Sequence, residues 1–254
     1  MIAKTPSHPE RLALIGYSNL LTGSTAAPLA LTANTYERYE PASGAVVAKF
    51  DLDALSPINY IAIAAHNIGT QDSGTEILFQ YATSIGGALT DIESITPTDN
   101  GAIMINFDSI DVAQIAITTN ATTSGLEIGV VYAGVTLQMQ QPIYGGHTPI
   151  DLSAVVTYQS TMSDSGQFLG RNVIRKGLET TFNWQHLEDD WIRSTFKPFI
   201  ISAQTLPFFI KWRPDYYDTT AFGYTTGDIK PSNMGGGSRL MSVSMNMRAH
   251  ADVI

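Results

Sequence analysis

Few side chains in this sequence have the types and spacing that chemistry requires. The five histidines form no His-x-x-x-His or His-Glu-x-x-His pattern, so a helix-borne zinc site is not predicted; they are His8, His66, His147, His186 and His250. The chain has no cysteine, which excludes disulfides, thiolate metal ligands and cysteine nucleophiles. A Gly-x-Ser-x-Gly nucleophile elbow is also missing.

The densest group of carboxylates is Glu188-Asp189-Asp190. Two acids that work on a glycosidic bond must face one substrate, whereas adjacent residues of a helix point in different directions. We therefore expect these three acids to lie at the N-terminal end of a helix, where the helix dipole is positive and stabilises negative charge. Two segments are rich in carboxylate oxygens but lack the spacing and glycine of an EF-hand: Asp51-Leu-Asp53 and Asp108-Ser-Ile-Asp111. Calcium binding by such a loop is an alternative that the sequence leaves open.

His66 and Asn67 follow an apolar run that is typical of a buried strand. Two roles are open for this pair: His66 could face a ligand loop, or it could end the strand with hydrogen bonds to the backbone, which is how most buried polar groups are satisfied. With no convergent catalytic set, the sequence predicts no enzyme activity, no cofactor and no metal site.

Four aromatic residues lie in a segment that the sequence predicts to be a long polar loop, residues 216–237. Their burial is not implied by any hydrophobic periodicity, and exposed aromatic side chains are favoured in protein interfaces. The sequence therefore predicts a subunit interface at Tyr216, Tyr217, Phe222 and Tyr224.

The elements that must position these residues are mainly β. The chain has 254 residues, of which 44% are apolar and only 15% are charged. Abundant Gly, Thr, Ser and Ile favour strands and turns over long solvated helices. The net charge of −9 argues against binding to nucleic-acid phosphates. No apolar run is long enough to span a membrane, and residues 1–10 show no signal peptide.

Charge divides the chain into two parts. Residues 1–150 hold 4 basic and 13 acidic residues, whereas residues 151–254 hold 10 of each and all three tryptophans. The segment 141–149 is rich in Pro and Gly, as expected of a domain boundary. We therefore predict a jelly-roll domain at 1–145 and a β domain at 146–254.

Period-two alternation of apolar residues predicts six strands in the first part, separated by turn-rich segments. The expected strands are Ala45–Leu52, Tyr60–Ala65, Thr75–Ala82, Ala102–Phe107, Val112–Thr118 and Leu126–Tyr132. Such spacing is typical of an antiparallel sandwich or jelly roll.

The second part is also predicted to be β, with one helix. Alternation predicts strands at 155–161, 178–184 and 241–247, and prolines bound a short strand at 206–214. Apolar residues at spacings of three and four predict an amphipathic helix near 187–203. Asn183 is the expected cap, and Pro198 is expected to kink or split the helix.

Residues 10–140 resemble the galactose-binding-like (discoidin-type) jelly roll. The resemblance is carried by Leu14-Ile-Gly-Tyr-Ser-Asn-Leu20, Tyr36-Glu-Arg-Tyr39, Val47-Ala-Lys-Phe-Asp-Leu52, Ile58-Asn-Tyr-Ile-Ala-Ile-Ala-Ala-His-Asn67 and Ala113-Gln-Ile-Ala-Ile117. It implies the fold and assigns no ligand residue.

The second part resembles bacteriophage tail structural proteins, notably distal-tail (baseplate ring) proteins. The resemblance is carried by the Trp-rich helix, by Pro207-Phe-Phe-Ile-Lys-Trp-Arg-Pro214, by the long loop and by the closing alternating strand. It implies a virion protein, assembled in the host cytoplasm, that forms a ring with copies of itself and contacts other tail proteins such as tube, hub and fibre.

A different class of function stays open. The chain could be a carbohydrate-binding module for host-surface glycans that uses jelly-roll loops such as 66–74 and 120–125. These loops hold few aromatic residues.

Overall fold

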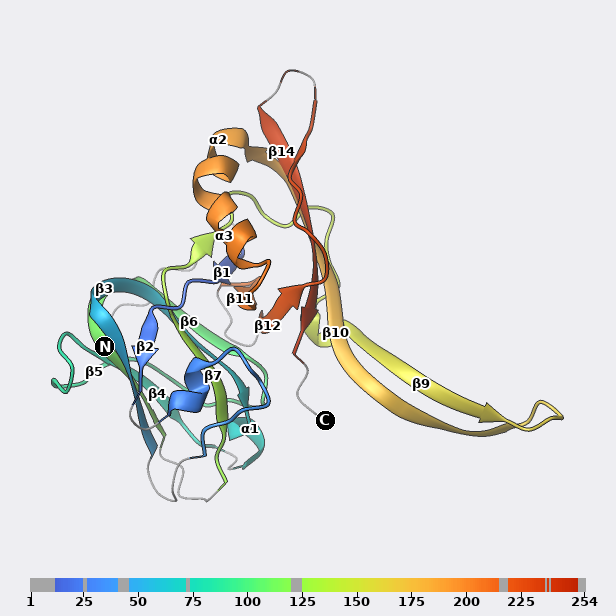
Figure 1. The fold of residues 1–254 in the computed structure, drawn as a ribbon, viewed down its shortest axis with the longest axis horizontal. Helices are drawn as coiled ribbons and strands as arrows, with labels where there is room; N and C mark the ends of the chain where they lie inside the picture. Colours follow the sequence, from blue (N-terminus) through green and yellow to red (C-terminus); the bar gives the residue numbers. More distant parts are fainter. Residues whose placement is uncertain are drawn as a thin grey trace.

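The computed structural model describes residues 12–24, 27–40, 46–71, 74–119, 125–214, 219–235, 237 and 239–250. The protein is mainly β, as the sequence predicted, with two antiparallel sheets and one short helical segment (Figure 1). The short helices outside that segment are η1 (Pro28–Leu31), α1 (Ile68–Gln71) and η2 (Ile150–Leu152).

The six-stranded sheet folds on itself into the expected jelly-roll sandwich. Its strands are β2 (Leu21–Gly23), β3 (Val46–His66), β4 (Ile77–Ala82), β5 (Thr90–Ile95), β6 (Ile103–Thr119) and β7 (Ile128–Gly134). They run in the order β2-β3-β6-β4-β5, with β7 paired to β3. We call residues 46–134, which hold five of these six strands, the jelly-roll module.

Two long strands close this sandwich. β3 and β6 pair along most of their length, with a register shift between Asp51 and Ser56 of β3. On one side of the shift the pair continues into β2 and β4, and on the other side β3 pairs with β7. The expected strands at 45–52 and 60–65 are therefore one strand, as are those at 102–107 and 112–118. The bulge bends each strand from one layer into the other without ending it.

The second sheet has eight strands, in the order β8-β1-β11-β12-β14-β10-β9, with β13 paired to β14. They are β1 (Leu14–Gly16), β8 (Leu137–Gln138), β9 (Ala154–Met162), β10 (Phe168–Glu188), β11 (Phe208–Lys211), β12 (Thr220–Thr225), β13 (Ser232–Asn233) and β14 (Leu240–Ala249). We call it the large sheet. It takes in β1 and β8, which precede residue 145, and the division into domains at that residue stays a prediction.

The helix predicted near 187–203 is confirmed. It consists of α2 (Asp189–Trp191), a π-helical turn η3 (Ile192–Phe196) and α3 (Lys197–Ser202). The change from π to α pattern comes at Lys197, one residue before Pro198, which lies in the first turn of α3 and has no N–H to donate. The expected cap was wrong: Asn183 lies within β10, and Glu188 precedes the helix without a side-chain capping bond.

The central part of the large sheet is covered on both faces. The helix covers one face with a cluster that includes Trp184, Phe196, Phe199 and Phe208. The other face packs on the jelly-roll module through a cluster made of Leu14, Tyr60, Ala62, Ala64, Met104, Val130, Tyr132, Phe209 and Phe222. Because side chains alternate along a strand, neighbours in β11 serve different cores. We call this second cluster the inter-module core.

His147 gives the structure a pH-dependent contact. Its ring lies 4.8 Å from that of Trp212 and 4.9 Å from that of Phe182, and its buried Nε2 has no hydrogen-bond partner among the described residues. Burial lowers the pKa of His147 from 6.5. The unfolded chain therefore takes up this proton first as the pH falls, and stability present above about pH 6.5 is lost below it.

We expect His147→Phe to reduce this loss, because phenylalanine keeps a ring between Trp212 and Phe182 but binds no proton. Urea midpoints measured at about pH 7.5 and about pH 5 should differ less in the variant than in the original chain. His186→Phe is the control at an exposed histidine. An unchanged pH dependence in His147→Phe would contradict the assignment.

Candidate functional site

The most distinctive surface feature is a hairpin arm, residues 154–177, formed by β9 and the first half of β10. The two strands pair from Ala154–Leu178 to Met162–Phe168. β14 joins β10 only from Leu178 onward, so the arm continues beyond the sheet as a two-stranded ribbon. Figure 1 shows it projecting away from the rest of the molecule. At about 3.3 Å per residue, nine residues of β9 span roughly 30 Å.

Both faces of the arm are exposed. Nearly every described side chain of β9 is exposed, and seven large apolar side chains of the arm are 44% to 64% exposed: Val155, Tyr158, Met162, Phe168, Leu169, Val173 and Ile174. A two-stranded hairpin has no interior in which to bury such residues, and isolated hairpins are marginally stable in water. A large apolar surface of this kind marks a contact with another molecule.

The arm has a defined shape although it lacks a core. The guanidinium of Arg171 lies 4.6 Å from the centre of the Tyr158 ring, and its Nε donates to Ser160 Oγ at 3.1 Å. At the tip, Gln167 N donates to Ser163 Oγ at 3.0 Å, and Gly166 takes a φ of +79° that favours glycine. These contacts hold the ribbon in register.

The sequence predicted only one strand of the arm. Residues 155–161 were expected as a strand, but 168–177 were not. Register shifts at 168–170 and 173–175 break the period of two there and put apolar residues side by side in the sequence. The turn Ser163-Asp-Ser-Gly166 between two β-branched runs was the available signal of a hairpin.

The expected aromatic interface is only partly described. Tyr216 and Tyr217 lie outside the described residues. The expected loop 216–237 contains a strand, β12, between β11 and β14, and this corrects the expectation that Phe222 is exposed. Its ring is 3% exposed and belongs to the inter-module core. Tyr224 is 49% exposed and stays a candidate contact residue.

Tyr224 borders an open groove of about 650 Å³ at the base of the arm. Lys176, Leu206 and Arg248 also line it, together with the jelly-roll-side segment 33–35. The groove is continuous with the arm through Lys176 and Gly177, so both belong to one candidate contact surface.

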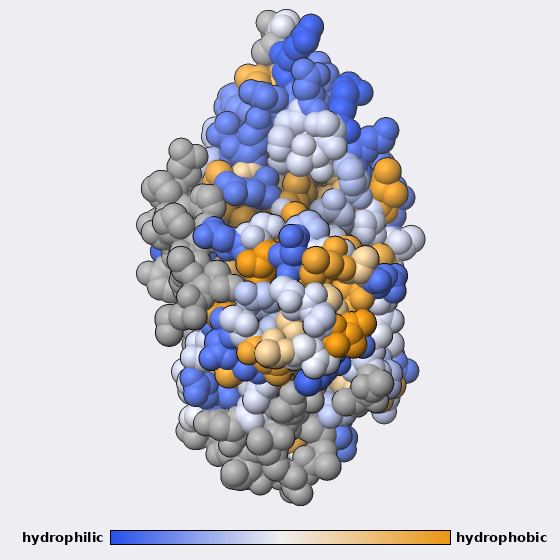
Figure 2. Space-filling view, turned by 90° about the vertical axis from the view of Figure 1, so that its left-hand side faces the viewer, coloured by the Kyte–Doolittle hydropathy of each residue, from blue (hydrophilic) through white to orange (hydrophobic). Residues whose placement is uncertain are grey.

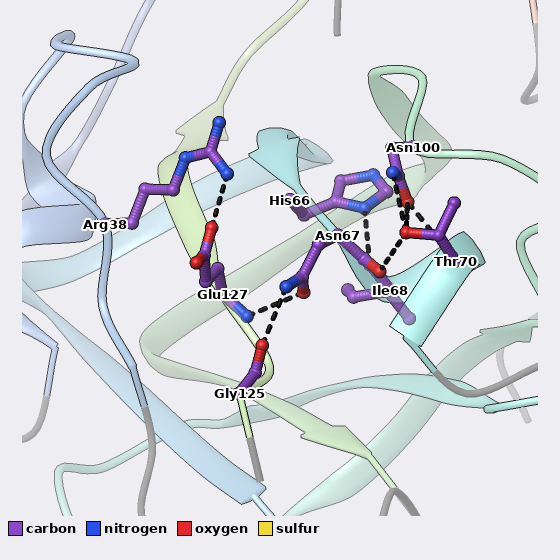
Figure 3. Close-up of polar contacts among 8 residues, drawn as sticks. All are labelled: Arg38, His66, Asn67, Ile68, Thr70, Asn100, Gly125 and Glu127. Atoms are coloured by element: carbon purple, nitrogen blue, oxygen red, sulfur yellow. Dashed lines mark hydrogen bonds and ion pairs between the residues drawn. The ribbon is translucent and has the colours of Figure 1, made fainter. Parts of the chain in front are cut away.

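Of the loops 66–74 and 120–125 that could bind a sugar, residues 72–73 and 120–124 lie outside the described part of the chain. The described ends of the two loops meet at Asn67 (Figure 3). His66 Nε2 lies 2.8 Å from the carbonyl of Gly101, and Ile68 N donates to His66 Nδ1 at 3.4 Å. This geometry makes Nε2 the protonated nitrogen. Of the two roles that were open, His66 takes the one at a strand end, bonded to the backbone.

Asn67 ties two loops together. Its amide donates to the carbonyl of Gly125 at 2.7 Å, and its Oδ1 accepts from Glu127 N at 2.8 Å. Arg38 forms an ion pair with the Glu127 carboxylate. Thr70, which is exposed, and Asn100, which is half-buried, exchange side-chain hydrogen bonds at 3.0 and 3.4 Å. Most polar groups in Figure 3 thus bind the protein's own loops.

Two of the acidic candidates, Asp189 and Asp51, have side-chain partners in the structure. Asp189 accepts from Arg193 Nε at 2.7 Å in the first turn of the helix, where negative charge is favourable. Asp51 accepts from Gln114 Nε2 at 2.6 Å on the outer face of the sandwich. Among the described residues, no three His, Asp or Glu side chains gather where they could hold a metal ion.

Buried tyrosines account for the other resolved changes in acidity. Burial raises the pKa of Tyr132 to about 12 and that of Tyr60 well above its usual value of 10. The Tyr60 hydroxyl donates to the carbonyl of Ser18. Both rings belong to the inter-module core, so these shifts reflect packing. In the described part of the chain, no helix is both long and apolar enough to cross a bilayer.

No known family profile matches the chain, and no curated protein is similar to it. Several solved structures share part of the fold. The CBM32 domain of AlyQ, solved with 4,5-unsaturated mannuronic acid, is 20% identical, with 46% of this chain and 96% of that chain covered and a TM-score of 0.38. CBM32-1 from a family 31 glycoside hydrolase of Clostridium perfringens is 15% identical, covering 48% and 93% with a TM-score of 0.36.

A truncated AlyQ with CBM32 and alginate lyase domains is 16% identical, with 70% of this chain and 49% of that chain covered and a TM-score of 0.39. These likenesses are too distant to bear on what this chain binds.

Proposed function

We propose that this chain is a non-enzymatic structural protein that assembles with copies of itself through the hairpin arm, as a component of the tail tip or baseplate of a bacteriophage virion. The observation that carries the proposal is the arm itself: a ribbon of about 30 Å with apolar side chains on both faces that no described part of its own chain covers.

The rest of the molecule suits a rigid building block. Two modules share the buried inter-module core, so the base of the arm is fixed relative to the jelly roll. A contact between arm and neighbour would then set the angle between subunits, which a closed ring requires. Tube, hub and fibre proteins of the tail are the proposed further partners, and the host cytoplasm is the proposed place of assembly.

The test is the oligomeric state of the full chain. We expect mass photometry and multi-angle light scattering to show a discrete oligomer. Replacing Phe168, Leu169 and Ile174 together by serine should yield monomers whose circular dichroism spectrum matches that of the original chain, because these side chains are 63% to 64% exposed and belong to neither core.

The matched control is Leu152→Ser with Ile201→Ser, two side chains outside the arm that are 72% and 57% exposed. This variant should assemble like the original chain. A monomeric original chain, or an arm variant that assembles normally, would overturn the proposal.

A second candidate function is carbohydrate binding by the jelly-roll module. The observation that favours it is the exposed residue Thr70, whose hydroxyl donates to the carbonyl of Asn67 and exchanges hydrogen bonds with the half-buried Asn100. Binding of a monomeric chain to a glycan array, lost in Asn100→Ala, would support this candidate over assembly.

A further inference from the structure

Each of the two strands of the arm has one edge that pairs with no other described strand. β9 is the last strand of the large sheet, and β10 pairs only with β9 before Leu178. Both outer edges of the ribbon therefore carry backbone N–H and C=O groups with no partner strand among the described residues. Such edges are templates for pairing with a strand of another chain.

The jelly-roll module offers a complementary edge at β5. This strand is the last one of its sheet and pairs only with β4 among the described strands. It carries Asp91 and Glu93 in six residues, and the carboxylate of Asp91 is held by Gln80 Nε2 at 2.7 Å. Charged residues on an edge strand discourage pairing with most strands, so an acidic edge favours a basic partner.

The charges of the two edges are opposite. The arm contains three basic residues, Arg171, Arg175 and Lys176, and one acid, Asp164. The jelly-roll module, residues 46–134, contains ten acids and a single basic residue, Lys49. Opposite charge across an interface speeds encounter and selects the partner.

The arm cannot reach β5 of its own chain. In Figure 1 the arm points to one end of the longest axis, and β5 lies near the other end. Figure 2 shows the side of the molecule that faces away from the arm, where hydrophobic side chains are exposed between polar ones across the middle. A contact between opposite ends of identical chains is heterologous, and it generates a ring when the rotation closes.

Building on the proposed function, we propose that the arm of one copy pairs with the β5 edge of the jelly-roll module in the next copy. The pairing strand of the arm is β10, which carries Arg171 and Lys176. Arg171 and Lys176 of the arm then lie against Asp91 and Glu93 of the neighbour. The jelly roll acts as the receptor for the arm.

Charge reversal tests this pairing. Arg171→Glu with Lys176→Glu, and separately Asp91→Lys with Glu93→Lys, should each raise the Kd of self-association by about 100-fold or more, because each places like charges across the interface. All four substitutions in one chain restore opposite charges and should restore the oligomer. Assembly of the original chain should weaken as NaCl is raised.

The matched control for net charge is Asp53→Lys with Asp111→Lys, two exposed acids at the bend of the sandwich. It should assemble normally. If the Asp91/Glu93 variant assembles like the original chain while the Arg171/Lys176 variant does not, the receptor is wrong but arm-mediated assembly stands. If the original chain is monomeric, both proposals fail. If the four-fold variant stays monomeric, the pairing is overturned.

Discussion

Phe209→Ala is expected to lower the free energy of unfolding by about 3–5 kcal/mol and to separate the unfolding of the two modules. The Phe209 ring is 0% exposed. It lies 4.7 Å from the ring of Phe222 in the large sheet and 5.4 Å from that of Tyr132 in the jelly-roll module. Truncation leaves a cavity at the centre of the inter-module core.

The neighbouring Phe208 is the matched comparison, because it points to the opposite face of the same strand. Its ring meets that of Phe199 at 5.0 Å on the helix side of the large sheet. Phe208→Ala should cost a similar amount of stability but leave the modules coupled. Differential scanning calorimetry should therefore show one transition for the original chain and for Phe208→Ala, and two for Phe209→Ala.

Tyr144→Ala is the control for loss of a ring alone, because this side chain is 54% exposed and lies outside the arm. Its melting temperature should match that of the original chain. A single, unshifted transition in Phe209→Ala would show that the inter-module core does not couple the modules.

The opposite roles of Phe208 and Phe209 illustrate which features could be predicted from the sequence and which could not. Local periodicity predicted the fold class, the helix and the closing strand, because each depends on residues near one another in the chain. One face of β11 is covered by the helix and the other by the jelly-roll module. This arrangement depends on the strands that pair with β11, namely β1 at residues 14–16 and β12 at residues 220–225. No local pattern contains that information.

The same reason explains the errors. Phe222 was expected in a loop because β12 is buried on both faces along its first four residues and shows no alternation. The arm was half missed for the opposite reason: both of its faces are exposed, so burial imposes no pattern on it. Periodicity reports one buried and one exposed face, and these two segments have other environments.

Lys211 carries the second large expected effect. It is 2% exposed and lies on the same face of β11 as Phe209, directed at the jelly-roll module. Its ammonium donates to the carbonyl of Met104 and to Asn106 Oδ1, both at 2.9 Å, and both acceptors belong to β6. A buried ammonium is tolerated only when hydrogen bonds replace its lost hydration.

Lys211→Ala should lower the free energy of unfolding by about 2–4 kcal/mol, because it removes two charge-assisted bonds and leaves buried acceptors in the jelly roll without this donor. Lys211→Met, which fills the same space without charge, separates the contribution of packing from that of hydrogen bonding. We expect it to recover part of the loss. Urea unfolding followed by tryptophan fluorescence measures all three chains.

Lys230→Ala is the control. The Lys230 side chain is 79% exposed, and its ammonium lies 3.1 Å from Asp228. Exposed ion pairs contribute little, so this change should be within about 0.5 kcal/mol of the original chain. A Lys211→Ala chain of unchanged stability would mean that water replaces the ammonium at Met104 and Asn106, and the contact between modules would then rest on the aromatic rings alone.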